Sequence, residues 1–329
     1  MSMVSGKSPT ARGRFVATVT LNTEICKDHY ALVLGLEAFP ATYPGQFVEL
    51  ACRNVDLDYS PETEFSWEPG EGLAPGGLEL MNPLALLRRP FSLAGRRVVD
   101  GGVELEFIYR TVGVGTTWMS RLLPGSAVHL IGPLGNHFEL PPGDGAAILV
   151  GGGVGIPPML YLASALAGRR AVLFAGALNR DLLPLTITAD SPSPGSDSVE
   201  PLYNIAEAAR HNIPAVIATD DGSFGFHGLV TQALEQHLDR FTHHALRITI
   251  YTCGPEPMMK RVAQIAIDRG IECQISVERA MACGMGTCQS CVIRVKKADR
   301  SKPPLAGKEW CYRLACTDGP IFKASELLW

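Results

Sequence analysis

The stretch MACGMGTCQSCV, residues 281–292, places three thiols among glycines. Cys283, Cys288 and Cys291 stand in the order C-x4-C-x2-C. Thiolate sulfur is a soft donor that suits the iron of a cluster and also zinc. A short loop that carries three such donors therefore predicts a metal centre.

The spacing of the three cysteines favours a [2Fe-2S] cluster. Plant-type clusters take three ligands from C-x4-C-x2-C and the fourth from further along the chain. Here the two candidates for the fourth ligand are Cys311 and Cys316. Gly284 and Gly286 can adopt positive φ, so the loop can curl tightly and direct its N–H groups at sulfur.

Other interpretations of the cysteines agree less well with the sequence. A structural zinc site usually has two short C-x2-C pairs. Disulfides need an oxidising compartment, but the chain shows no secretion signal and its nine cysteines are an odd number. Buried free thiols are the expectation for Cys26, Cys52 and Cys273, which lie in apolar segments.

The composition is that of a compact protein with two domains or slightly more. Of the 329 residues, 46% are hydrophobic and 19% are charged. No apolar run approaches the roughly 20 residues that span a membrane, and the N-terminal residues lack the apolar segment of a secretion signal, so we expect a cytoplasmic protein. A net charge of −4 without a Lys/Arg block argues against a nucleic-acid partner.

The N-terminal part is expected to be an antiparallel β-barrel. After a disordered tail over residues 1–12, residues 13–142 contain short β-type runs separated by turns: FVATVTL, HYALVLGL, PGQFVELAC, PFSLAG, GVELEFIYR and AVHLIGPLG. Strands at this density are typical of a barrel. One helix is expected near residues 116–123. Residues 54–82, rich in Asp, Glu, Pro and Gly, are expected to form an inserted loop, either a functional lid or a passive decoration.

Strands alternate with helices over residues 143–275. The segment AAILVGGGVGIPPMLYLASALAG indicates a strand, a glycine turn and a helix, and the strands RAVLFAGA, PAVIATDD, LRITIYTCG and ECQISVE follow, with helices between them, the first at YNIAEAARH. This alternation predicts a doubly wound α/β domain with a mostly parallel sheet. Residues 276–329 form a short cysteine-rich tail that we expect a cofactor to organise.

Two turns of the α/β domain could bind a nucleotide. The first follows a strand and precedes a helix, and its glycines are Gly151, Gly152, Gly153 and Gly155. At such a turn the helix dipole and free N–H groups favour a pyrophosphate, although the run is not a complete GxGxxG. The second turn ends a later strand with Cys253, Gly254 and Pro255. By themselves these residues fit a buried cysteine and a plain turn better than a ligand site.

The barrel part contains candidate contacts for another phosphate-bearing ligand. They are Arg89, Pro90, Phe91 and Ser92, then Ile108, Tyr109 and Arg110, and finally Gly113, Gly115 and Thr116 ahead of the expected helix. Arginine can bind phosphate bidentately, proline holds the chain extended, an aromatic ring can flank a planar ring system, and a hydroxyl can reach a ribityl or phosphate oxygen. Each signal is weak alone, because most surface arginines are simply solvated.

In their order along the chain, these motifs resemble a known family. The motifs are PGQFVEL, RRPFS, IYR, GVGTTWMS, GPLGN, LVGGGVGIPPM, ATDDGS, TCGPEPMM, ACGMGTCQSC and ACTDGPIF. Together, from Phe15 to Phe322, they are similar to the electron-transfer subunit of the NAD-linked bacterial dihydroorotate dehydrogenase, in the ferredoxin reductase superfamily. Only the cysteine motif is specific by itself, so the order of the motifs identifies the family.

The resemblance implies FAD in the barrel, NAD in the α/β domain and a [2Fe-2S] cluster in the C-terminal domain. The implied FAD contacts are Arg89, Pro90, Phe91, Ser92, Ile108, Tyr109, Arg110, Gly115 and Thr116. The implied cluster ligands are Cys283, Cys288, Cys291 and Cys316. Cys316 is preferred over Cys311 because the last cysteine of the family precedes an x-D-G-P sequence, which here is TDGP.

The resemblance also implies a function in pyrimidine biosynthesis. Dihydroorotate would be oxidised at FMN in a separate catalytic subunit, expected in a heterotetramer with this chain, and electrons would pass through the cluster and FAD to NAD. FAD is needed because a cluster carries one electron at a time whereas NAD takes a hydride. No acid-base catalytic residue is required. The alternatives are a reductase subunit of a hydrogenase, glutamate synthase or oxygenase, and a redox sensor without enzymatic activity.

Three features depart from the family pattern. The insertion at residues 54–82 is longer than usual, His137 stands where a small residue is expected, and Cys311 is an additional thiol. Arg180 could meet a 2′-phosphate and Asp181 a ribose hydroxyl, so the residues leave NADP open, whereas the resemblance favours NAD.

Overall fold

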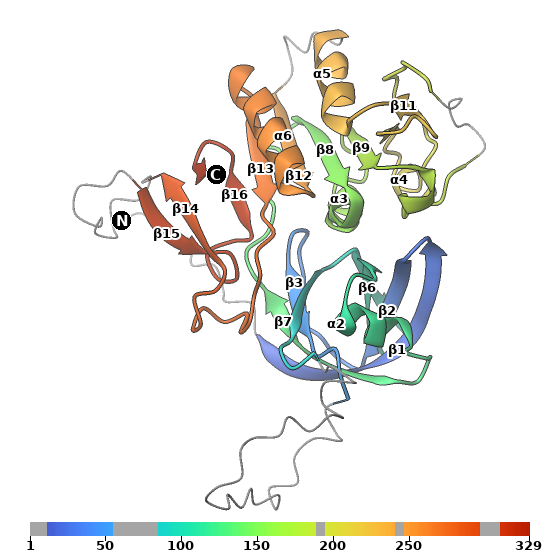
Figure 1. Ribbon diagram of the computed structural model, residues 1–329, viewed down its shortest axis with the longest axis vertical. Coiled ribbons are helices and arrows are strands. Elements are labelled where there is room, and N and C mark those ends of the chain that lie inside the picture. The colour runs from blue at the N-terminus through green and yellow to red at the C-terminus, as the bar shows by residue number, and fades with distance from the viewer. Residues whose placement is uncertain (1–11, 55–84, 189–194, 241–246, 297–309) are drawn as a thin grey trace, which may run out of the picture.

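The computed structural model describes residues 12–54, 85–188, 195–240, 247–296 and 310–329. Three β-sheets, one of them covered by helices, make up the fold (Figure 1). The expected N-terminal tail, apart from residue 12, and the expected insertion, apart from Asn54, lie outside the described residues.

The first sheet is an open antiparallel barrel of seven strands. Their order in the sheet is β4-β3-β7-β1-β2-β6-β5. Their bounds are β1 Gly13–Cys26, β2 His29–Leu36, β3 Phe47–Leu50, β4 Arg89–Ser92, β5 Gly95–Val99, β6 Gly102–Arg110 and β7 Ala127–Leu134. All six predicted runs form strands. The hydrophobic pattern failed to predict β5 as a separate strand because Arg97, Val98 and Val99 are exposed.

Alternation of side chains gives the barrel an inner and an outer face. Along β6, Leu105, Phe107 and Tyr109 join the barrel core, whereas Ile108 packs against the core of the α/β domain. A strand of this kind can therefore carry a ligand on its outer face while its inner face holds the barrel together. Helix α2, Val114–Ser120, begins two residues before the predicted start.

The second sheet belongs to the doubly wound α/β domain. Its strand order is β11-β10-β9-β8-β12-β13-β16, in which all pairs are parallel except that of β13 with β16. The strands are β8 Ala146–Gly152, β9 Ala171–Ala177, β10 Ala215–Thr219, β11 Phe226–His227, β12 Ile248–Cys253 and β13 Glu272–Ser276. The helices are η1 Gly153–Gly155, α3 Ile156–Ala165, η2 Arg180–Leu182, α4 Ala206–Ala209, α5 Val230–Arg240 and α6 Glu256–Asp268. The helix predicted at YNIAEAARH is thus only the short α4.

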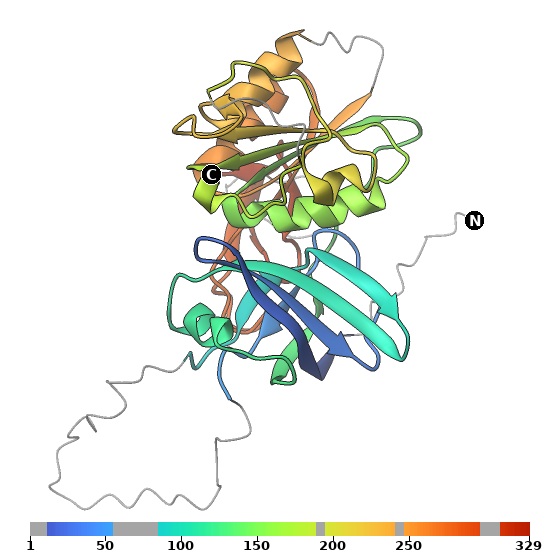
Figure 2. The same cartoon turned by 90° about the vertical axis from the view of Figure 1, so that its right-hand side faces the viewer.

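Helices cover both faces of this sheet. Helices α3 and α4 pack on one face, and α5 and α6 on the other. Helix α3 lies between the sheet and the barrel (Figure 2), and it contacts β5 of the barrel. The chain order reverses between β8 and β12, which is the switch point where α/β sheets bind ligands beyond the carboxyl ends of their strands.

The C-terminal segment forms a small third sheet of order β15-β14-β17. Its strands are β14 Val292–Lys296, β15 Trp310–Leu314 and β17 Leu327–Leu328. Strand β16, Ile321–Lys323, lies between β15 and β17 in the chain, but it pairs with β13 of the α/β domain and is not part of this sheet. Ile293, Val295 and Phe322 also belong to one buried cluster with the α5 and α6 side of that domain. The C-terminal segment therefore packs into the core of the α/β domain, which the sequence analysis did not predict.

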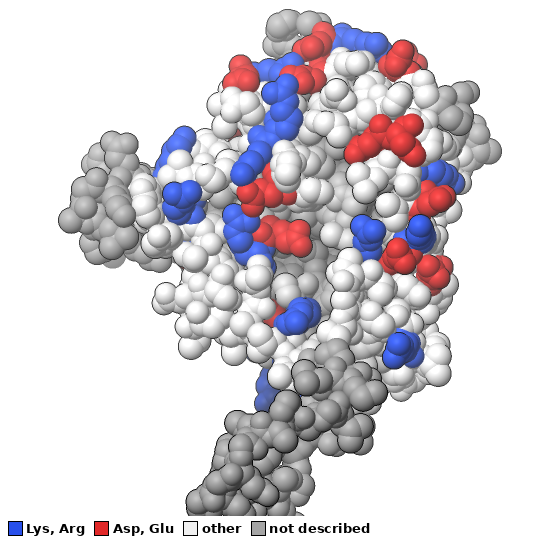
Figure 3. All heavy atoms as spheres, viewed as in Figure 1, with Lys and Arg blue, Asp and Glu red and all other residues white. Residues whose placement is uncertain are grey.

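Among the described residues, no helix is both long and apolar enough to cross a membrane. On the face drawn in Figure 3, basic and acidic side chains are interspersed. Ion pairs between such side chains include Arg261 with Glu235 and Arg269 with Asp239, at 2.7 Å each.

Candidate functional site

The loop between β13 and β14 holds its cysteines in a tight curl. The main-chain N–H groups of Met285 and Cys288 both donate to Cys283 Sγ at 3.4 Å. Gly284 and Gly286 have φ of 64° and 86°, which confirms the predicted positive values. N–H groups directed at cysteine sulfur are the usual surroundings of an iron-sulfur cluster.

Cys316 comes to this loop from the turn after β15. Its N–H donates to Cys291 Sγ at 3.4 Å, and both residues are buried. Cys311 lies instead within β15, paired with Val295 of β14, and packs against the buried cluster of the α/β domain. The structure thus brings Cys316, not Cys311, to the three cysteines of the loop.

The four cysteines are arranged as two pairs. Cys283 contacts Cys288 on the exposed side of the loop, and Cys291 contacts Cys316 on the buried side. Each iron of a [2Fe-2S] cluster takes two protein thiolates, so pairs fit a cluster better than tetrahedral zinc.

The two pairs differ in their electrostatic surroundings. Hydrogen bonds from the Ser290 hydroxyl and main chain, and then from Cys283, lower the pKa of Cys288 to about 6. Burial, and then the neighbouring Cys291 and Cys283, raise the pKa of Cys316 to about 12. A bound cation lowers the pKa of a coordinating thiol, so iron is the partner that would make Cys316 a thiolate.

The remaining thiols have no part in this group. Cys52 and Cys273 are buried, as predicted. Burial raises the pKa of Cys52 to about 12 and also raises that of Cys273, so both are neutral thiols. The prediction for Cys26 was wrong in part, because this residue is only half-buried at the end of β1.

The predicted flavin residues of β4 lie at an edge of the barrel. Strand β4 pairs with β3 on one side only, with Pro90 opposite Glu49 and Arg89 opposite Leu50. Arg89 is exposed, and among the described residues its guanidinium donates only to the main-chain oxygens of Leu87 and Arg88, at 3.2 and 3.3 Å. Because these local hydrogen bonds are weak, the guanidinium group remains accessible to a phosphate.

The residues at the end of β6 divide between the two faces of the barrel. Tyr109 is buried in the core, where its hydroxyl donates to Asn22 Oδ1 at 3.1 Å and its ring meets the edge of Phe91 at 6.2 Å. Arg110 Nε and the neighbouring Thr111 Oγ1 are buried and have no hydrogen-bond partner among the residues that the structure describes. Buried donors of this kind need a partner, and a flavin phosphate or hydroxyl beside them would supply one.

The start of α2 adjoins these donors. The Thr116 hydroxyl accepts from the N–H groups of Val112 and Gly113, at 2.9 and 3.2 Å, and so fixes the turn into the helix. Gly115 is buried against Cys52 and Ala85, where a side chain would be tight. Of the elements that carry the sequence-predicted set, β6 contacts both β4 and η1.

The two predicted nucleotide turns meet at the switch point of the α/β sheet. Cys253 pairs with Gly151 at the carboxyl ends of β12 and β8. A side chain at Gly155 would overlap the main chain of Cys253 and Gly254, so glycine is required for this approach. Burial raises the pKa of Cys253 to about 12, so its thiol is neutral. The two turns thus meet at the carboxyl ends of adjacent parallel strands, which is where α/β sheets commonly bind dinucleotides.

Glu49 is a residue of this region that sequence reasoning missed. It lies on β3, is 1% exposed, and neither carboxylate oxygen has a hydrogen-bond partner within the described part of the chain. A Cβ at Gly284 would lie 2.8 Å from Glu49 Cγ, so β3 directly touches the cysteine loop. Burial raises the pKa of Glu49 to about 7, against smaller opposing effects of Arg88 and Arg89. A lone acid within the apolar run PGQFVELAC was the available signal.

We expect Glu49 to make stability depend on pH. Its folded pKa lies above the ordinary 4.5, so the folded state binds the proton more tightly, and stability falls as pH rises from about 4.5 to about 7. In Glu49→Gln, the decrease in the free energy of unfolding over this pH range should be smaller by up to about 3 kcal/mol. Unfolding midpoints measured from pH 4.5 to pH 8 test it, with the exposed Glu37→Gln as control. Parallel curves for wild type and Glu49→Gln would contradict the expectation.

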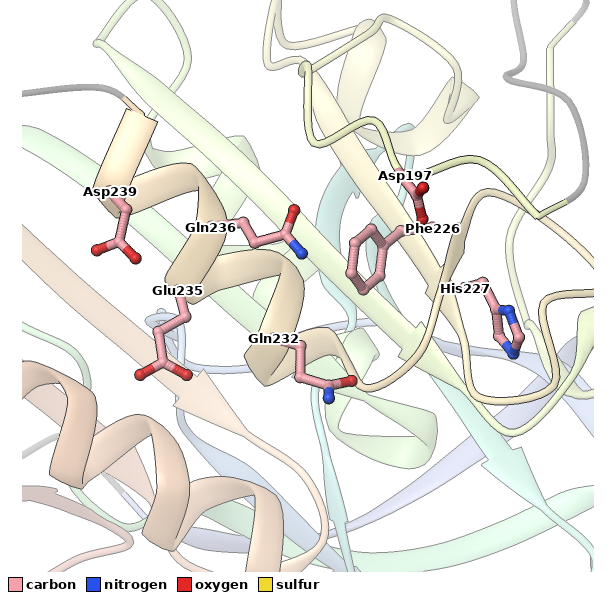
Figure 4. A pocket seen from close by; sticks show the side chains of 7 residues that line it. All are labelled: Asp197, Phe226, His227, Gln232, Glu235, Gln236 and Asp239. Atoms are coloured by element: carbon pink, nitrogen blue, oxygen red, sulfur yellow. The ribbon is translucent and has the colours of Figure 1, made fainter.

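A hollow elsewhere on the surface has a different character. It lies along α5 and β11 and is lined by Asp197, Phe226, His227, Gln232, Glu235, Gln236 and Asp239 (Figure 4). None of these is a predicted site residue. No lysine or arginine is among its lining residues, and two of its three carboxylates are already paired with arginines, so it offers a pyrophosphate no cationic partner.

Comparisons with known proteins agree with this geometry. Residues 278–328 match the model of the iron-sulfur cluster binding domain of dihydroorotate dehydrogenase B. The chain is 35% identical over 245 residues, covering 74% of it and 80% of the relative, to the dihydroorotate dehydrogenase B (NAD(+)) electron transfer subunit of Geobacillus sp. (strain WCH70). Its identity to the subunit of the same name from Shouchella clausii (strain KSM-K16) is 33% over 315 residues, or 94% of this chain and 96% of that one.

Solved structures agree on the fold. An NADH-dependent reduced ferredoxin-NADP oxidoreductase superimposes with a TM-score of 0.64 at 24% identity, over 99% of this chain and 92% of the other. The Amycolatopsis cytochrome P450 reductase GcoB gives a TM-score of 0.55 at 25% identity, over 82% of this chain and 70% of that one. Identity of about a third over most of the length of the curated relatives is decisive: the chain belongs to the family of dihydroorotate dehydrogenase B (NAD(+)) electron transfer subunits.

Proposed function

We propose that this chain passes electrons from a dihydroorotate-oxidising, FMN-containing catalytic subunit to NAD in pyrimidine biosynthesis. Its relatives are named as electron transfer subunits of dihydroorotate dehydrogenase B, and such a subunit acts with a catalytic one. Dihydroorotate gives up two electrons and two protons on becoming orotate. NAD⁺ takes both electrons and one proton as hydride, and the second proton goes to solvent.

The observation that carries the proposal is the position of the cysteine pairs against the barrel. Gly284, between two of the cysteines, packs on Glu49 of β3 and Leu134 of β7. Strand β3 is hydrogen-bonded to β4, which holds the predicted flavin residues. On its other side the barrel contacts η1 and α3 of the α/β domain. These contacts support the proposal that the cluster, the flavin and the nicotinamide bind one after another along this path.

The residues would have distinct roles. Cys283, Cys288, Cys291 and Cys316 would hold the cluster, which carries single electrons. The FAD contacts would be Arg89, Pro90, Phe91, Ser92, Ile108, Tyr109, Arg110, Gly115 and Thr116. The NAD contacts would be Gly151, Gly152, Gly153, Gly155, Cys253, Gly254 and Pro255. FAD would accept or donate a hydride and exchange single electrons with the cluster. The protein itself binds, orients and shields these groups, and no side chain needs to act as a general acid or base.

The exposed side of the cysteine loop is the natural entry for electrons. Cys288 is exposed, and beside it Met285 is 54% exposed. An apolar side chain held in solvent next to a redox site suits contact with a partner protein. We propose that the catalytic subunit docks over this side, in a heterotetramer of two copies of each subunit.

The purified protein should carry one FAD and one [2Fe-2S] cluster. It should oxidise NADH with an artificial acceptor and should not oxidise dihydroorotate until the FMN-binding subunit is added. Iron, acid-labile sulfide and flavin analyses after anaerobic purification, followed by activity with and without that subunit, test this. Zinc in place of iron, an absence of flavin, or dihydroorotate oxidation by the chain alone would refute the proposal.

A further inference from the structure

We propose that Asn136 is a positioning residue for electron transfer, which fixes the turn carrying Cys316 against the flavin-binding barrel. The inference rests on the proposed function and deepens it. Asn136 follows β7 of the barrel, and its side chain reaches a segment more than 180 residues further along the chain.

The Asn136 side chain uses both of its amide donors and its carbonyl acceptor. Nδ2 donates to the main-chain oxygens of Asp318 and Ile321, at 3.1 and 2.9 Å, and Oδ1 accepts from the N–H of Ile321 at 2.9 Å. Its own N–H donates to the oxygen of Gly319 at 2.7 Å. Only an amide offers two donors and an acceptor in this arrangement, and the two carbonyls and one N–H also fix which way the amide points.

The preceding residue makes the approach possible. Gly135 has φ of 76°, which favours glycine, and a Cβ there would lie 2.5 Å from Pro320 Cδ. Any side chain at this position would push the turn away from the barrel. Two adjacent residues, one by bonding and one by its lack of a side chain, thus hold the same turn.

A continuous hydrogen-bonded path joins this turn to the flavin strand. Strand β4 pairs with β3, β3 pairs with β7, and β7 leads into Asn136. Within the turn, Leu314 N–H donates to Asp318 Oδ2 at 2.8 Å, which closes the loop around Cys316. The position of the buried Cys316 relative to the barrel is therefore set by Asn136, and with it the separation between cluster and flavin.

The test uses the full chain with its cofactors, and compares Asn136→Ala, Asn136→Asp and Gly135→Ala with wild type. NADH delivers two electrons and one proton to FAD as a hydride, and one of these electrons passes on to the cluster. Flavin reduction by NADH should be unchanged. Appearance of the reduced-cluster signal, followed by rapid-freeze electron paramagnetic resonance, should slow by about tenfold or more, since small misplacements of reacting groups carry large rate penalties.

A second readout does not depend on electron transfer. The amide of Ile321 loses its acceptor in Asn136→Ala, so its hydrogen exchange should accelerate by about tenfold. Asn136→Asp keeps the acceptor but loses both donors, so the main-chain oxygens of Asp318 and Ile321 are left facing a carboxylate. Its Ile321 amide should stay protected while the electron transfer slows.

Tyr161→Phe is the matched control. The Tyr161 hydroxyl, on α3, donates to the main-chain oxygen of Thr42 at 2.9 Å and also bonds to its hydroxyl, so it ties the barrel to the α/β domain instead. This variant should leave the flavin-to-cluster step and the exchange at Ile321 unchanged.

Each outcome decides the proposal. A slowed cluster signal, or loss of the cluster with FAD and NADH oxidation intact, supports the positioning role. Unchanged rates and exchange in Asn136→Ala and Gly135→Ala overturn it. So does joint loss of FAD and cluster in all three variants, which would show that the two residues merely serve folding. A wild-type protein without a cluster would instead refute the proposed function.

Discussion

Replacing Cys316 by serine should abolish the visible absorbance of the iron-sulfur cluster and electron transfer to the partner subunit. Cys316 is buried and lies in the turn that the Asp318 side chain closes, and its N–H donates to Cys291 Sγ. Serine is a much poorer ligand for cluster iron, so the buried iron would lack one of its two thiolates. Because metal binding contributes directly to the stability of small metal-centred segments, the three-stranded sheet should loosen as well.

The flavin half of the protein should survive this change. Reduction of FAD by NADH uses the barrel and the α/β domain, and neither depends on the Cys316 thiol. Cys311→Ser is the matched control, because Cys311 lies in β15 opposite Val295 and packs against the α/β core. Absorbance spectra, iron content and NADH-driven flavin bleaching distinguish the two variants. A bleached Cys311→Ser beside an intact Cys316→Ser would overturn the ligand assignment.

Much of this architecture is local enough to be predicted from sequence. The alternation of strands and helices predicted the α/β domain, because a parallel strand and its crossover helix are contiguous in the chain. The curl of the cysteine loop was also predictable, since Gly284 and Gly286 set its backbone within a few residues of the sulfurs. The order of the motifs predicted the family, which identity to curated relatives confirms.

Features that depend on distant segments escaped prediction. Asn136 meets Asp318 and Ile321 only because the tail folds back over the barrel, and no periodicity in either segment signals that contact. The pairing of β16 with β13 was not predicted for the same reason, because it also joins segments that are far apart in the chain. Strand β5 was missed for a different reason, because its exposed side chains lack the alternation on which strand prediction relies.

Replacing Arg89 by alanine should weaken the retention of FAD about tenfold to a hundredfold. A charge-assisted hydrogen bond to a phosphate contributes about 1.5–3 kcal/mol, and each 1.4 kcal/mol changes affinity about tenfold. Within the part of the chain that the structure describes, the Arg89 guanidinium forms hydrogen bonds only to the main-chain oxygens of Leu87 and Arg88. Its loss therefore removes little internal stabilisation, so the effect should fall on the flavin and not on folding. Flavin content after dilution and gel filtration, and the iron content of the same samples, measure it.

Arg97→Ala separates this role from a general effect of charge on the barrel. Arg97 is also exposed, but its guanidinium is paired with Glu104 and Glu106, at 2.7 and 2.8 Å, on the strands β5 and β6. If positive charge on the barrel retained FAD by long-range attraction alone, both variants should lose flavin similarly. The wild type should then also lose flavin as the salt concentration rises. If Arg89 contacts the phosphate, Arg89→Ala alone should lose flavin, while the cluster, for which Cys283, Cys288, Cys291 and Cys316 are the proposed ligands, should remain in both variants. Equal flavin retention by the wild type and Arg89→Ala would show that this guanidinium is only a surface charge, and would leave Arg110, with its unpartnered buried Nε, as the remaining arginine of the predicted flavin set.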